Sequence, residues 1–194
     1  MTLTSDLTAC RRCDLWRNAT QVVGGIGPPT ARLMLVGEQP GDAEDLAGVP
    51  FVGPAGRVLD HALAQAGLQR DRLYVTNAVK HFKFALRGKR RLHKRPDTGE
   101  IIACRFWLDQ ERAAIAPLVI VAMGATAAYA IFGRKMPVMA TRGRPMDLAA
   151  GARAIITIHP SYLLRIRTKP EQAQAMAEFV TDLELAAELS DTAA

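Results

Sequence analysis

The chain has 194 residues, of which 49% are hydrophobic and 23% charged, and this balance predicts a globular protein with one buried core. Collagen-like, fibrous and disordered classes are excluded by the composition. The 25 lysines and arginines exceed the 19 acidic residues and give a formal net charge of +6.

Strands and helices are predicted to alternate along the chain. Four apolar runs are typical of buried strands: residues 31–38, 73–79, 118–124 and 152–160. Helical patterns cover residues 53–67, 101–115, 125–133 and 170–189, the last preceded by Thr168 as a candidate cap. This alternation predicts one α/β domain over residues 1–194, a three-layer sandwich with a central, mostly parallel four-stranded sheet.

Polar residues follow the ends of all four predicted strands. They are the segment GEQPGD at residues 37–42, Asn77, Gly124 and His159. Because ligands bind at the carboxyl ends of parallel strands, we expect these residues to line one site.

A basic loop lies at about residues 83–96, inside an irregular stretch over residues 80–98. Residues 87–95 read RGKRRLHKR and hold six cations and no acid. This concentration of charge predicts contact with phosphates, and a solvated basic turn is the alternative.

Three cysteines suggest a metal site. Cys10 and Cys13 form a C-x2-C pair before the first strand, where a thioredoxin-type redox motif does not occur, and Cys104 lies in a predicted helix. A four-coordinate site needs one more ligand, and His81 is the best candidate. Zinc and an iron–sulfur cluster both remain open, as does an incidental pair beside a buried Cys104.

The first residues lack the basic and apolar regions of an export signal, so we expect a protein of the reducing cytoplasm. The longest mostly apolar stretch, residues 118–133, is shorter than the ~20 residues of a membrane span. We therefore expect no contact with membranes, and we expect a monomer.

Separated motifs resemble those of the family 4 iron–sulfur uracil-DNA glycosylases. The segments are GEQPG-x9-FVGPAG from residue 37, TNAVKH from residue 76 and HPSYLL from residue 159. Three departures look like the UdgX type, whose members become covalently attached to DNA after uracil excision. GEQPG replaces GEAPG, His81 replaces a cysteine, and a basic insertion ends in GKRRLH. The resemblance implies a [4Fe-4S] cluster held by Cys10, Cys13, His81 and Cys104.

The resemblance implies uracil-containing DNA as the partner, with single-stranded DNA as a candidate form. An excised base must leave the stack and enter a pocket that holds its face and its Watson–Crick edge. Phe51 fits the first task, and the Asn77 amide fits the second because it can accept from uracil N3–H and donate to O4. Gly37 belongs to the same binding set, and Arg90 and Arg91 are expected to bind phosphates.

Cleavage of the glycosidic bond leaves negative charge on uracil and positive charge on the sugar. His159 and N–H groups around Gln39 can stabilise the uracil, and either Glu38 or Asp42 can stabilise the cation or accept a proton. The resemblance makes His93 the nucleophile that attacks the sugar. Two alternatives stay open: a conventional multiple-turnover uracil-DNA glycosylase with a solvated His93, and a non-catalytic, metal-stabilised nucleic-acid-binding protein.

Overall fold

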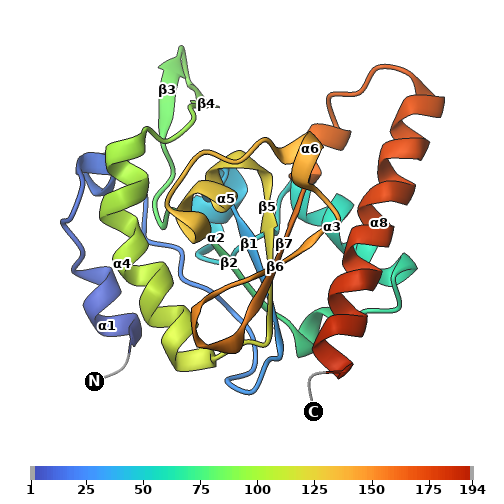
Figure 1. The fold of residues 1–194 in the computed structure, drawn as a ribbon. Helices are drawn as coiled ribbons and strands as arrows, with labels where there is room; N and C mark the ends of the chain where they lie inside the picture. The colour runs from blue at the N-terminus through green and yellow to red at the C-terminus, as the bar shows by residue number, and fades with distance from the viewer. Residues whose placement is uncertain (1–2, 193–194) are drawn as a thin grey trace.

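A computed structural model describes residues 3–192, and a five-stranded sheet lies at its centre (Figure 1). The strand order is β2 (Tyr74–Asn77), β1 (Leu33–Gly37), β5 (Val119–Met123), β7 (Arg153–Thr157) and β6 (Pro145–Asp147). The first four are parallel, and β6 pairs antiparallel with β7. The predicted α/β sandwich is confirmed, but the prediction of four strands was wrong. The missed strand is a three-residue edge strand that begins with proline and shows no apolar run.

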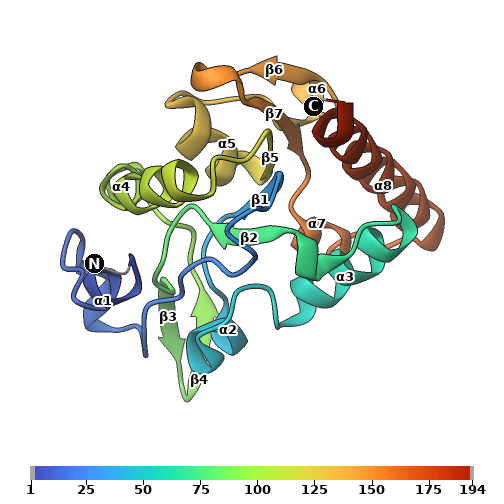
Figure 2. The same ribbon diagram turned by 90° about the horizontal axis from the view of Figure 1, so that it is seen from below.

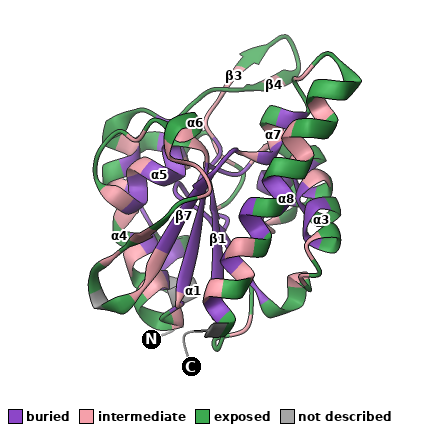
Figure 3. Cartoon of the chain, turned by 45° about the vertical axis from the view of Figure 1, so that its right-hand side comes forward, coloured by how far each residue is buried: buried purple, intermediate pink, exposed green. Residues whose placement is uncertain are grey.

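Helices cover both faces of the sheet (Figure 2). One face packs against α1 (Leu3–Thr8), α4 (Thr98–Ile115) and α5 (Gly124–Phe132). The other packs against α3 (Pro54–Gln65), α7 (Pro160–Leu163) and α8 (Lys169–Thr192). Strands β1 and β5 are buried at every position, which explains their continuous apolar sequences (Figure 3).

Side-chain caps begin helices α4 and α8. Helix α4 begins three residues earlier than predicted because Asp97 caps it and forms a capping box with Glu100. Thr168 precedes α8 and its hydroxyl accepts the N–H of Glu171 at 3.4 Å, as the cap prediction requires.

Shorter elements complete the chain. They are the 3-10 turns η1 (Asp14–Arg17), η2 (Arg70–Arg72) and η3 (Ala149–Gly151), and the short helices α2 (Asp42–Ala47) and α6 (Val138–Thr141). None of the helices within residues 3–192 is long and apolar enough to cross a membrane.

The stretch predicted to be irregular, residues 80–98, instead contains a β-hairpin. Strands β3 (Phe84–Arg87) and β4 (Arg90–His93) pair antiparallel and project from the body of the molecule (Figure 1). The two-residue connection begins at Gly88, whose φ of 60° suits the tight turn. The run of cations hid the alternation that would have indicated strands.

Candidate active site

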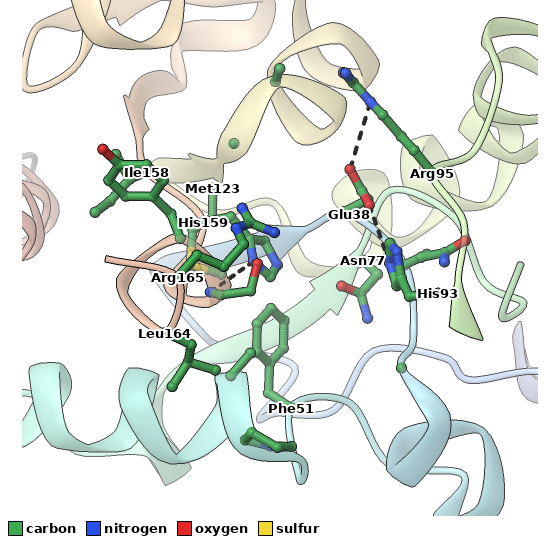
Figure 4. A pocket seen from close by; sticks show the side chains of 18 of the residues that line it. Glu38, Phe51, Asn77, His93, Arg95, Met123, Ile158, His159, Leu164 and Arg165 are labelled. Atoms are coloured by element: carbon green, nitrogen blue, oxygen red, sulfur yellow. Dashed lines mark hydrogen bonds and ion pairs between the residues drawn. The ribbon is translucent and has the colours of Figure 1, made fainter. Parts of the chain in front are cut away.

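A pocket of about 1000 Å³ lies at the carboxyl ends of the parallel strands (Figure 4). Its lining includes Glu38, Phe51, Asn77, His93 and His159, which come from the loops after β1, β2 and β7 and from the end of β4. The expected convergence of the strand ends is therefore present, and the hairpin contributes to the same rim.

Gly37 and Asn77 lie opposite each other at the ends of β1 and β2. A side chain at Gly37 would collide with the Asn77 Oδ1 atom and with the Phe51 ring, so the glycine makes room for both side chains to meet here. Asn77 is 3% exposed, and its Oδ1 has no hydrogen-bond partner within the described part of the chain. A buried, unpaired acceptor is costly, which indicates an atom available for a ligand donor.

The Phe51 backbone is held in a left-handed conformation, with a φ of 55°. The Arg70 guanidinium donates to the carbonyl oxygens of Pro50 at 2.9 Å and Phe51 at 3.1 Å, and it also pairs with Asp60. These bonds stabilise the strained turn and place the Phe51 ring 5.9 Å from the His159 ring. Nothing in the sequence indicated this role for Arg70.

His159 is neutral in the ordinary pH range. Burial, with smaller contributions from the nearby His93 and Arg165, lowers the pKa of its ring to about 4. Its Nδ1 accepts the Ser161 N–H at 3.2 Å, so the ring proton lies on Nε2. The side chain is therefore a neutral donor at the pocket.

Glu38 faces His93. The Glu38 Oε1 atom lies 3.3 Å from His93 Nε2 (Figure 4). Glu38 Oε2 accepts the Thr126 hydroxyl at 2.6 Å. Arg95 Nε lies 3.9 Å from the same Oε2. Thr126, in the first turn of α5, therefore holds Glu38 Oε2 and leaves Oε1 directed toward His93. Sequence reasoning missed Thr126 because a threonine in a helix carries no signal of its own.

The Gln39 side chain ties together the two ends of the hairpin. Its Nε2 donates to the carbonyl oxygens of Lys83 and Lys94, both at 3.1 Å, and its Oε1 accepts the Lys83 N–H at 3.1 Å. Gln39 is 6% exposed. Its amide is thus engaged by the hairpin backbone, next to the strand that carries His93.

Arg90 and Arg91, expected to act alike, point to opposite faces of β4 because side chains alternate along a strand. Arg90 is exposed. Arg91 pairs with Asp42, and its NH1 atom lies 2.6 Å from Asp45 Oδ2. Asp42 therefore faces Arg91, whereas Glu38 faces His93.

The three cysteines lie near one another beside α4. Burial raises the pKa of the Cys104 thiol to about 12, with Lys80 acting against this shift and the neighbouring Cys13 and Cys10 adding to it. Trp107 Nε1–H donates to Cys10 Sγ at 3.0 Å, and the Lys80 N–H donates to Cys104 Sγ at 3.2 Å.

His81 is 5% exposed, and burial lowers its pKa, so the ring is in the neutral form that binds metals. Across residues 3–192, no three potential ligands are close enough for a single ion. A cluster of several irons holds its ligand sulfurs farther apart than one ion does. The sulfur-rich donor set, with N–H donors to two sulfurs, is of the kind that suits an iron–sulfur cluster.

A pocket at the carboxyl edge of a parallel sheet, lined by an unpaired amide, an aromatic ring and titratable side chains, is typical of an α/β enzyme. Residues 25–184 match the family model of the Uracil DNA glycosylase superfamily, and the chain belongs to this superfamily.

Its relatives include the Type-4 uracil-DNA glycosylase of Thermotoga maritima, 40% identical over 160 residues that cover 82% of this chain and 80% of that protein. The Type-4 enzyme of Pyrobaculum aerophilum is 32% identical over 80% of each chain. That of Archaeoglobus fulgidus is 39% identical over 66% of this chain and 60% of its own.

The lowered pKa of His159 predicts a pH dependence of stability. Between about pH 6.5 and 4 the unfolded chain binds a proton at this ring that the folded chain does not, so stability is lost as the pH falls through this window. We expect His159→Asn, whose side-chain oxygen can replace Nδ1 as acceptor, to reduce the fall in melting temperature from pH 7 to pH 5. Equal falls in this variant and the wild type would contradict the prediction, and exposed His61→Asn is the matched control.

The two faces of β4 predict different effects of its arginines. Arg90→Gln should lower the slope of log Kd for an oligonucleotide against log salt by about 0.7–0.9 for each lost phosphate contact, with little change in melting temperature. Arg91→Gln should instead lower the melting temperature, because it leaves the buried Asp45 without its cation. A salt slope unchanged by Arg90→Gln would show that this side chain does not bind phosphate.

Proposed function

We propose that this protein excises uracil from DNA and that His93 then attacks the sugar of the abasic site, which leaves the protein covalently bound to DNA. The observation that carries the proposal is the pair formed by His93 and Glu38. Their atoms lie 3.3 Å apart at the rim of the pocket that also holds Asn77 and Phe51. An imidazole beside a carboxylate is an activated nucleophile.

Uracil recognition is assigned to Asn77 and Phe51. The unpaired Asn77 Oδ1 would accept from uracil N3–H, and its amide N–H would donate to O4. Cytosine presents an acceptor and a donor in the reverse order, so it would leave both amide atoms opposed by like groups. Phe51, whose ring lies against Gly37 beside Asn77, would stack on the base.

Bond cleavage is assigned to His159 and Glu38. The glycosidic electron pair leaves with uracil, and the neutral His159 would donate its Nε2–H to an oxygen that gains negative charge. The Glu38 carboxylate, held by Thr126, would stabilise the positive sugar. Of the two acids expected to serve here, the geometry favours Glu38, because Asp42 is paired with Arg91.

Capture follows if His93 reaches the sugar cation before water does. The unprotonated ring nitrogen of His93 supplies the electron pair of the new bond to the anomeric carbon. The proton on the other ring nitrogen then passes to Glu38. The product then carries a neutral imidazole, whose departure as an imidazolide is unfavourable. The link between protein and DNA should therefore persist.

A conventional multiple-turnover glycosylase is the second candidate, favoured by the relatives, which are named Type-4 uracil-DNA glycosylases, and by the 49% exposure of the His93 side chain. There Glu38 would direct a water instead. Denaturing electrophoresis after incubation with single-stranded and duplex uracil-containing oligonucleotides separates the candidates. A shifted protein band supports capture, and free cleavable product supports turnover. The absence of both results supports a non-catalytic binder.

His93→Ser should abolish the covalent species while uracil release continues, because His159 and Glu38 remain and water can enter. Mass spectrometry of the wild-type adduct should place the sugar on the peptide that contains His93. A cross-link that survives in the variant, or one on a lysine that requires borohydride, would overturn the histidine mechanism. Lys89→Ser, in the exposed hairpin turn, is the control for changes in the hairpin.

We also propose that Cys10, Cys13, Cys104 and His81 hold a [4Fe-4S] cluster. When bound, the cluster would cross-link the N-terminal segment to α4 and the loop after β2, which is a structural task. Protein purified anaerobically should be brown and contain iron, and Cys104→Ser should lower both the iron content and the melting temperature. Zinc as the sole stoichiometric metal would contradict this prediction.

A further inference from the structure

Lys80 is a completely buried cation directly after the predicted uracil-reading segment. Its side chain is 0% exposed, and its Nζ donates to Thr76 Oγ1 at 2.7 Å and to the Asn77 carbonyl oxygen at 2.7 Å. The third partner is Glu111 Oε2, at 2.6 Å. All three N–H donors of the ammonium are therefore used.

Glu111 anchors this cation from helix α4. It lies in α4, its Oε1 accepts the Gly25 N–H at 2.9 Å, and its Oε2 accepts the Thr76 hydroxyl at 2.8 Å. The carboxylate is thus held by two chain segments in addition to Lys80. Because the Glu111 carboxylate is fixed in this way, it holds the Lys80 ammonium in a single position.

The Lys80 main chain is fixed as firmly as its side chain. Its N–H donates to Cys104 Sγ at 3.2 Å, and its carbonyl accepts the Val23 N–H at 2.8 Å. The loop before it donates from Ala78 N to Gly37 O at 2.9 Å and from Val79 N to Glu38 O at 3.0 Å. This loop therefore joins the strand ends that carry Gly37, Glu38 and Asn77.

Stability alone does not require such a charge. Buried ion pairs can often be replaced by apolar residues without loss of stability, because removing two charges from water is costly. Lys80 differs from an ordinary buried ion pair because it also contacts a residue of the candidate active site. Its ammonium holds the carbonyl of Asn77, the residue whose side-chain Oδ1 is left unpaired at the pocket.

We infer that Lys80 is a positioning residue for base recognition: by binding the Asn77 carbonyl, it holds the Asn77 peptide so that the side-chain amide meets the uracil edge. Glu111 acts through Lys80, and neither side chain lines the pocket. This assignment rests on the proposed recognition of uracil by Asn77.

The test is the double variant Lys80→Met/Glu111→Gln. Methionine fills the space of the lysine stem without a donor, and the new amide can keep the bonds to the Gly25 N–H and to Thr76. We expect a folded protein with wild-type affinity for an oligonucleotide that carries a non-cleavable abasic analogue. Inhibition by free uracil should weaken, and the second-order rate constant for uracil release in a single turnover should fall about tenfold or more, the equivalent of one charge-assisted hydrogen bond.

Thr76→Val is the matched control, because it removes a hydroxyl from the same cluster and leaves the Lys80–Asn77 and Lys80–Glu111 contacts in place. It should keep most of the uracil affinity. A fall as large as that of the double variant would show that the cluster as a whole, and not the Lys80–Asn77 bond, is responsible.

A folded double variant with wild-type uracil inhibition and excision would overturn the inference. If that variant does not fold, Lys80→Met/Glu111→Leu, which makes the pair apolar, is judged by the same two measurements. Failure of the proposed function is recognised separately in the wild type. If the wild type releases uracil but forms no covalent link to DNA, the Lys80 test can still be carried out. A wild type that neither binds nor releases uracil refutes the proposed function itself.

Discussion

The parallel pairing of β1 with β2, in which Gly37 lies opposite Asn77, is the constraint on which the whole site depends. Because parallel strands end at the same edge, this register places the loop that follows Gly37 beside the amide of Asn77. The missing side chain at Gly37 then lets the Phe51 ring approach Asn77. A shift of one residue would turn the Asn77 side chain to the other face of the sheet.

The hairpin is held at this edge by polar contacts, together with the buried Phe82 ring, which packs against Phe84 and His93. The Gln39 amide binds the backbone at both of its ends, and Arg91 pairs with carboxylates of α2. These contacts carry His93 to Glu38, so a protruding and mostly exposed segment supplies a side chain to the pocket rim. Charge-assisted bonds of this kind give position and direction where little apolar area is buried.

Buried polar groups divide into those that are satisfied within the protein and those that are left for a ligand. The side-chain polar atoms of Lys80 and Glu111 all have hydrogen-bond partners within the protein, and Lys80 binds the backbone carbonyl of Asn77 at the pocket. Asn77 Oδ1, in contrast, is the one buried side-chain oxygen or nitrogen without a partner among the described residues. The cost of that unpaired acceptor is recovered only when a donor enters, which links the rigidity of the support to the selectivity of the site.

The sequence by itself determined the α/β class, the strand-end residues and the order of the motifs, because apolar periodicity and capping are local properties that a single segment displays. Tertiary structure alone decided that β6 joins the sheet, that the basic stretch is a hairpin, and that Glu38 and not Asp42 faces His93. The contribution of Thr126 was equally hidden, since its hydroxyl meets a residue 88 positions away. Such contacts depend on how distant segments pack, and no pattern within one segment records them.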